Sequence, residues 1–259
     1  MLPLSILAAM VLASPPLSVV EENPQARGGS GPGLALVFVP HGQSSRAELD
    51  EDVARFMAAL RSAEPWASYS GLRVFRLLPV AEAATRCSVV REHALKPHLR
   101  CDRGLAPLLD AAGLPPGYKI VVLSRSAVDP AATVSAPGVP SVVFFGLAFT
   151  SRDVDLRHAV LHEMGHAFGL RDEEAVLRVD HASAARTPGR PNCAPDRATA
   201  ATWWGDVAGA GYYLGCAGSK RFVRPTADSF MTRSGRSESY GPVSLRWLTE
   251  ALRSHYAFR

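Results

Sequence analysis

Residues 162–172 read HEMGHAFGLRD, and this run constrains the chain more than any other feature. In a helix, His162 and His166 lie one turn apart on the same face, so both imidazoles can bind one metal ion. Glu163 lies beside the first ligand, where its carboxylate can reach a water molecule and act as a general base. The pattern therefore predicts a metal site on a helix, with Glu163 as its catalytic residue.

The residues after His166 supply a third ligand. Gly169 can end the helix and turn the chain back, and Asp172 then follows the turn. Two histidines and one carboxylate leave the fourth position of a Zn²⁺ ion open, which is typical of a catalytic rather than a structural site. Glu173 and, after a longer loop, His181 are alternative third ligands. The acidic run 172–174 also fits the start of a following helix.

A helix is expected to carry this motif. Apolar side chains repeat at helical spacing at Val160, Met164 and Phe168. Thr150 and Asp153 offer a start like a capping box, which gives a helix of about four turns ending at Gly169. The alternative is a buried helix with two ordinary core histidines. That alternative does not account for Glu163, Gly169 and Asp172, which stand at the positions where a catalytic metal site would use them.

Apolar runs alternate with helical patterns up to about residue 170, which predicts an α/β (α+β) fold with a largely parallel sheet. The predicted strands are 34–39, 72–77, 119–123 and 142–145, and the clearest helix is 47–63. The strand at 142–145 either borders a cleft, where an extended peptide adds as a further strand, or lies fully in the core. Residues 181–241 are rich in Gly, Pro and Ser and predict an irregular lobe, closed by a helix around 242–254.

The apolar start of the chain suggests export. Residues 1–20 read as a signal peptide cleaved before Ser14, or else as an N-terminal arm, although no Lys or Arg precedes Ser14. Residues 21–33 read as a linker, and 34–259 as one domain with an upper lobe (34–170) and a lower lobe (171–259). No later stretch is long enough to span a membrane.

Four cysteines are present without any CxxC motif. In an exported chain an even number predicts two disulfides. The simplest pairing is Cys87 with Cys101 and Cys193 with Cys216, although three connectivities exist and four buried thiols remain an alternative. The net charge is +4 and no basic run exceeds two residues, so nucleic acid binding is not indicated.

The motif resembles that of the metzincin zinc metallopeptidases, with Asp172 where many members carry a third histidine. Residues 160–173 are most similar to the bacterial IgA-peptidase metallopeptidase family, although the loop between His166 and Asp172 is one residue shorter. Fainter similarities extend over roughly residues 34–255. They include Asn192-Cys193, Trp203-Trp204, Gly211-Tyr212, Arg224-Pro225 and Glu64-Pro65-Trp66.

The resemblance implies a metzincin-like catalytic domain, with a twisted sheet and active-site helix above a cleft and a small lobe below. It implies Zn²⁺ as cofactor and a methionine turn under the metal, for which Met231 in residues 229–232 is the candidate. Composition alone would make Met231 an ordinary core residue. A transition-state tyrosine often follows that turn, and Tyr240 is the next tyrosine, although a surface or core role suits its larger offset.

The expected function is a secreted or periplasmic bacterial zinc endopeptidase, monomeric, acting on a protein or peptide. One alternative is another zinc amide hydrolase of narrow specificity. A second is an inactive, metallopeptidase-like binding module, which the intact His162, Glu163 and His166 argue against. An intracellular enzyme would follow if residues 1–20 are not cleaved.

Overall fold

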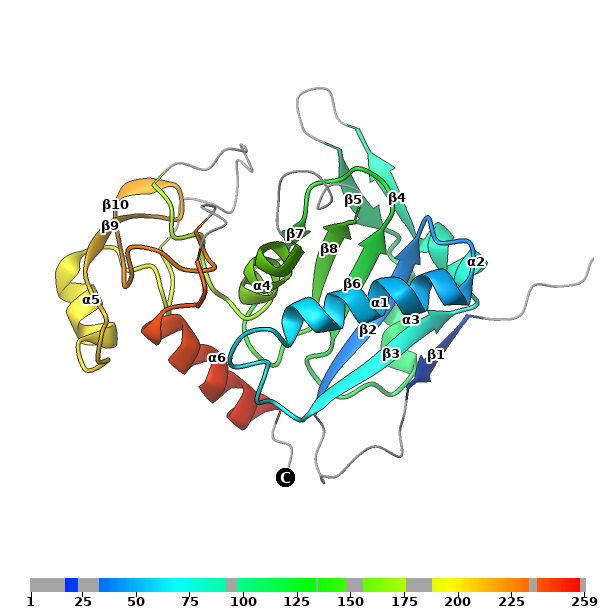
Figure 1. Cartoon of the computed structure of the whole chain (residues 1–259), viewed down its shortest axis with the longest axis horizontal. Coiled ribbons are helices and arrows are strands. Elements are labelled where there is room, and N and C mark those ends of the chain that lie inside the picture. The colour runs from blue at the N-terminus through cyan, green and yellow to red at the C-terminus, as the bar shows by residue number, and fades with distance from the viewer. Residues whose placement is uncertain are drawn as a thin grey trace, which may run out of the picture.

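The computed structural model describes residues 17–22, 33–91, 97–133, 135–147, 156–175, 188–232 and 237–256. A six-stranded sheet lies in the right-hand half of the molecule as drawn in Figure 1. In spatial order its strands are β1 (Ser18–Glu21), β3 (Leu72–Leu78), β2 (Leu34–His41), β6 (Lys119–Ser124), β8 (Ser141–Gly146) and β7 (Ala131–Ala132). The inner strands are parallel, and the edge strands β1 and β7 are antiparallel to their neighbours. The predicted α/β class with a largely parallel sheet is confirmed.

The side chains of β2 alternate between two hydrophobic cores. Leu34, Leu36 and Phe38 enter the core shared with α1 (Arg46–Leu60) and α4 (Leu156–His166). Ala35, Val37 and Val39 enter the core on the opposite face. That face is covered by α2 (Val80–Ala83), α3 (Leu105–Ala111) and the hairpin of β4 (Cys87–Val90) and β5 (His98–Cys101). Because both faces are covered, the parallel strands carry the continuous apolar runs seen in the sequence.

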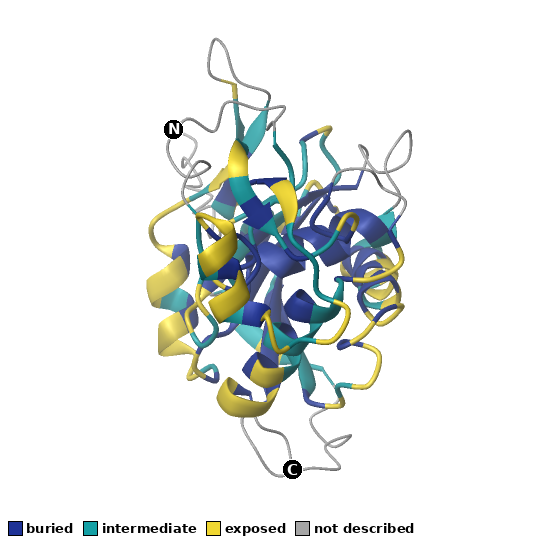
Figure 2. Cartoon of the chain, turned by 90° about the vertical axis from the view of Figure 1, so that its left-hand side faces the viewer, coloured by how far each residue is buried: buried dark blue, intermediate teal, exposed yellow. Residues whose placement is uncertain are grey.

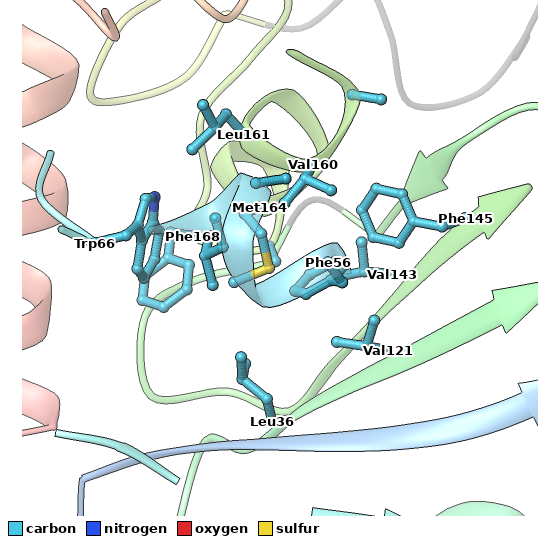
Figure 3. Packing of buried hydrophobic residues seen from close by; sticks show 14 of the residues in the cluster. Leu36, Phe56, Trp66, Val121, Val143, Phe145, Val160, Leu161, Met164 and Phe168 are labelled. Atoms are coloured by element: carbon cyan, nitrogen blue, oxygen red, sulfur yellow. The ribbon is translucent and has the colours of Figure 1, made fainter. Parts of the chain in front are cut away.

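The first core fixes the motif helix on the sheet (Figure 3). Phe56 on α1 makes edge-to-face contacts with Phe38 and Phe145, at centroid distances of 5.3 and 5.0 Å. Trp66 packs in the same manner against Phe168, just after α4, at 5.3 Å. Buried residues gather in the interior, and exposed residues lie on the outer faces of helices and on loops (Figure 2). Val160, Leu161 and Met164 of α4 belong to the same core, so the motif helix is packed against these aromatic side chains and the sheet.

The helix α4 ends as the sequence predicts. Gly169 has a φ of +93°, which favours glycine. Its N–H donates to the carbonyl of His166 at 3.0 Å, and the N–H of Leu170 donates to that of Gly165 at 3.1 Å. These two bonds form a Schellman motif, which reverses the chain directly after the second histidine. The predicted start of the helix at residues 150–153 lies outside the described residues.

The lower lobe is more regular than predicted. It contains α5 (Arg197–Trp204), β9 (Tyr213–Cys216), β10 (Ser219–Arg224) and α6 (Pro242–His255), of which only α6 was expected. Asp196 caps α5 by accepting a hydrogen bond from the N–H of Thr199 at 2.7 Å. Ala217 and Gly218 join the two strands with φ values of +47° and +73°. A cap and a two-residue turn are the signals that could have identified these elements.

The sheet begins earlier in the chain than residue 34. Val19 on β1 pairs with Leu77 on β3, and Glu21 forms an ion pair with Arg73 at 2.7 Å. Residues 18–21 therefore belong to the folded domain, whereas the expected cleavage position before Ser14 lies outside the described residues. Among the helices of the described parts of the chain, none is long and apolar enough to cross a membrane.

Candidate metal centre

The three predicted ligands meet at one point. Nε2 of His162 lies 3.2 Å from Oδ1 of Asp172, and Nε2 of His166 lies 3.5 Å from the same oxygen. One ligand atom from each residue lies within 4.8 Å of the other two. Both histidine side chains are about nine-tenths buried, whereas that of Asp172 is 17% exposed. This group can hold a metal ion.

The two histidines are oriented by backbone carbonyls. Nδ1 of His162 lies 2.8 Å from the carbonyl oxygen of Phe230, and Nδ1 of His166 lies 2.8 Å from that of Leu170. A carbonyl only accepts, so Nδ1 carries the proton and Nε2 of the neutral ring presents its lone pair. Metal-binding histidines commonly make this outer hydrogen bond. The donor set therefore fits a cation held between the two Nε2 atoms and the carboxylate of Asp172.

The charges at the site are strongly coupled. Burial lowers the pKa of His166, but the negative charge of Asp172 and the hydrogen bond that His166 donates to it outweigh burial and raise that pKa to about 9. Burial raises the pKa of Asp172, but His166 and His162 outweigh this effect and hold it well below its usual range. A bound cation would compete with a proton for Nε2 of His166 and would be stabilised by the same carboxylate.

Glu163 lies on α4 directly beside the first histidine. Glu163 is 7% exposed. Its negative charge is close enough to raise the pKa of His166. A carboxylate in this position can take up a proton near the ligand group. Another buried histidine, His158, precedes His162 by one turn, with its ring centroid 5.9 Å away, and was not identified from the sequence.

The predicted methionine turn lies against the motif helix. Met231 is fully buried in the first core, and its sulfur would lie 2.4 Å from a Cβ atom added to Gly165. The preceding residue, Phe230, supplies the carbonyl that binds His162. The turn thus orients His162, a candidate metal ligand, through its backbone and packs beside the motif helix through its methionine.

Replacing Gly165 with alanine is expected to destabilise the protein, although alanine is the better helix former by about 1 kcal/mol. The added methyl group would overlap the sulfur of Met231, and overpacking of this kind costs about 1 to 3 kcal/mol. Chemical denaturation of Gly165→Ala should show a net loss of up to about 2 kcal/mol in the free energy of unfolding, which is the overpacking cost less the gain in helix propensity. A gain in stability of about 1 kcal/mol, the full benefit of helix propensity, would contradict the close packing of these two residues.

Tyr240 is buried in the first core and does not belong to the ligand group. Its hydroxyl donates to the carbonyl of Leu161 at 2.5 Å and accepts from the indole N–H of Trp66 at 3.2 Å. Burial raises the pKa of this hydroxyl well above its usual value. Since both contacts are internal to the core, we assign Tyr240 no role with a substrate.

Glu173, an alternative third ligand, points away from the metal group into a cluster of polar side chains. Its carboxylate accepts from Nδ2 of Asn192 at Oε1 and from Oγ of Ser229 at Oε2, both at 2.9 Å. Burial raises the pKa of Glu173 to about 7, although these hydrogen bonds and the charge of Arg224 oppose the rise. Asn192 and Ser229 lie in segments that the family resemblance covers, but nothing in the sequence links either of them to Glu173. His181 lies outside the described residues.

Both disulfides have the predicted local pairing. Cys87–Cys101 joins β4 to β5, and Cys193–Cys216 lies in the lower lobe. None of the four cysteines is free. The second disulfide lies close to Asp172, because the N–H of Ala217, next to Cys216, donates to the carbonyl of Asp172 at 2.8 Å. The β9–β10 turn therefore supports the loop that carries Asp172.

The strand predicted to border a cleft, β8, is not the edge of the sheet. Ala131 and Ala132 on β7 pair with Phe144 and Val143 of β8, and cover that side of the strand. β7 is instead the edge strand, among the described residues, next to the motif helix. The chain continues from β7 to the C-terminal end of α4, where the N–H of Ser135 donates to the carbonyl of His166 at 3.1 Å.

No family model matches this sequence, and no curated protein matches it.

Proposed function

We propose that this protein is a zinc-dependent endopeptidase of the metzincin type, similar to the bacterial IgA-peptidase metallopeptidases. The observation that carries the proposal is the convergence of two Nε2 lone pairs and one carboxylate, with Glu163 beside them. The glycine turn after His166 and the buried Met231 beside Gly165 add support. This combination suits hydrolysis better than a closed structural metal site.

His162, His166 and Asp172 would hold the zinc ion. When bound, zinc supplies Lewis-acid chemistry: it acidifies a water molecule and polarises a carbonyl group. Glu163 would take the proton from the attacking water and pass it to the leaving amine. The carbonyls of Phe230 and Leu170 keep both histidines in the tautomer that binds a metal, so the ligands are oriented before the ion arrives.

A peptide substrate is expected to bind in extended form along β7. This short strand is the edge nearest the motif helix among the described residues, and the chain that follows it reaches His166. The free side of an edge strand offers backbone groups to an added strand, whatever the side chains of the substrate. Such pairing suits a peptide better than a small metabolite.

We further propose that the protein works outside the cytoplasm, in the periplasm or after secretion. Two disulfides, one of them next to the Asp172 loop, support this location, because such bonds persist in oxidising compartments. The apolar residues before the expected cleavage position at Ser14 agree with export.

Metal analysis and peptide cleavage test the proposal directly. Purified, unchelated protein should carry about one zinc per chain, and it should cleave members of a mixed peptide library. A chelator should stop cleavage, and added Zn²⁺ should restore it. Zinc without cleavage would favour an amide hydrolase of narrow specificity or a binding module. Absence of zinc would overturn the proposal.

A further inference from the structure

The buried carboxylate of Glu173 joins the supports of two different metal ligands. On one side it accepts from Ser229, whose Oγ also accepts from the N–H of Met231 at 3.0 Å. The backbone N–H of Glu173 donates to the carbonyl of Met231 at 2.8 Å. Glu173 therefore holds the turn whose neighbouring carbonyl, that of Phe230, orients His162.

On its other side, Glu173 is linked to the loop that carries Asp172. Asn192 accepts from the N–H of Arg171 at 2.9 Å and donates to the carbonyl of Arg171 at 2.9 Å, so it brackets the residue before the third ligand. The remaining N–H of its amide donates to Glu173. The side-chain oxygen and both side-chain N–H groups of Asn192 therefore make hydrogen bonds to residues of this loop.

A fourth residue completes what we call the Glu173 cluster: Glu173, Asn192, Ser229 and Arg224. Arg224 donates to the backbone carbonyl of Glu173 and places a positive charge near its carboxylate. Asn192, Ser229 and Glu173 are fully buried. Hydrogen bonds in such a dry environment fix their partners closely, and an unmatched polar group there is costly.

We propose that Glu173 is a positioning residue that sets the distance between Asp172 and His162, and thereby the affinity of the site for its metal. Within the cluster, its two carboxylate oxygens accept one bond each from the two supports, and no neutral side chain of the same size can do both. A glutamine has only one accepting oxygen, so its NH2 group must face one of the two supports, where the carboxylate accepts a hydrogen bond. The inference rests on the proposed metal centre, but it concerns the geometry of that centre rather than the reaction.

The test measures zinc affinity by competition with a chromophoric chelator in wild type, Glu173→Gln, Glu173→Ala and Ser229→Ala. Loss of an outer-shell partner typically weakens metal binding by about 10- to 100-fold. We expect the loss of zinc affinity to lie near the lower end of this range for Glu173→Gln and Ser229→Ala. The loss should be larger for Glu173→Ala. The control is Glu174→Gln, a change in the adjacent, partly exposed carboxylate, which should keep the affinity of wild type.

Cobalt substitution separates positioning from general stabilisation. The visible bands of bound Co²⁺ report ligand geometry, so Glu173→Gln and Ser229→Ala should shift them while Glu174→Gln should not. Circular dichroism identifies the folded variants, and Ser229→Ala keeps the test available if Glu173→Ala does not fold. Wild-type affinity and an unchanged cobalt spectrum in both Glu173→Gln and Ser229→Ala would overturn the inference, even if those variants melt earlier.

The outcomes distinguish this inference from the proposed function. If wild type binds zinc but the cluster variants bind it equally well, only the inference fails. If the variants weaken zinc binding but wild type cleaves no peptide, the inference holds and the endopeptidase proposal fails. If wild type binds no metal, both are overturned.

Discussion

Replacing Glu163 with glutamine is expected to lower the rate of peptide hydrolysis by about 10²- to 10⁴-fold, the usual contribution of a general base. Glutamine has the same size, so it fits the site, where Glu163 is 7% exposed. It cannot take a proton from water. Since Glu163 is not one of the three grouped ligands, the variant should keep the zinc content of wild type.

The measurement is kcat and KM on one peptide identified from the library, together with zinc content of the same preparation. Glu51→Gln on α1 is a suitable control, because it makes the same chemical change at an exposed position. The loss should fall mainly on kcat. Activity within tenfold of wild type would rule out Glu163 as the general base. Loss of zinc as well would assign it a structural role instead.

Asp172→Asn should show the largest loss of metal among variants of the acidic loop. Asparagine keeps the shape of the side chain but removes the charge that faces both histidines. A neutral amide oxygen is a weaker zinc ligand than a carboxylate, and two histidines alone make an incomplete site. After dialysis against a weak chelator, wild type should retain zinc and Asp172→Asn should not.

Two further variants identify the third ligand by comparison. Glu173→Gln should bind zinc more weakly than wild type but far more tightly than Asp172→Asn, because Glu173 faces the turn at residues 229–232 and not the ligand group. His181→Ala should bind zinc as wild type does. If Asp172→Asn keeps its zinc while one of these two variants loses it, the third ligand has been assigned to the wrong residue.

The parts of the structure that the sequence predicts well are those with strong local signals. Buried parallel strands must be apolar on both faces, so β2, β6 and β8 stand out as continuous runs. The candidate ligands His162 and His166 are separated by one helical turn, and Gly169 marks the reversal toward Asp172. These positions depend on short-range geometry, which a sequence states directly.

The parts that the sequence does not predict depend on distant contacts. β7 consists of Ala131 and Ala132, which have no periodicity and form a strand only because β8 offers its edge. Glu173 reads as one of three acidic residues at a helix start, and it is buried only because Asn192, Ser229 and Arg224 come to it from later parts of the chain. Local sequence patterns do not indicate partners that lie far away in the chain.

The packing of Gly165 against Met231 also restricts how the sequence can diverge. Met231 fills the space that a side chain at position 165 would need. A larger residue at position 165 therefore requires a smaller one at position 231. In an alignment of relatives, these two columns should change together, although they lie in separate parts of the chain. The sequence pattern of such relatives would then include the glycine before the second histidine together with the methionine. This glycine takes no part in the proposed reaction.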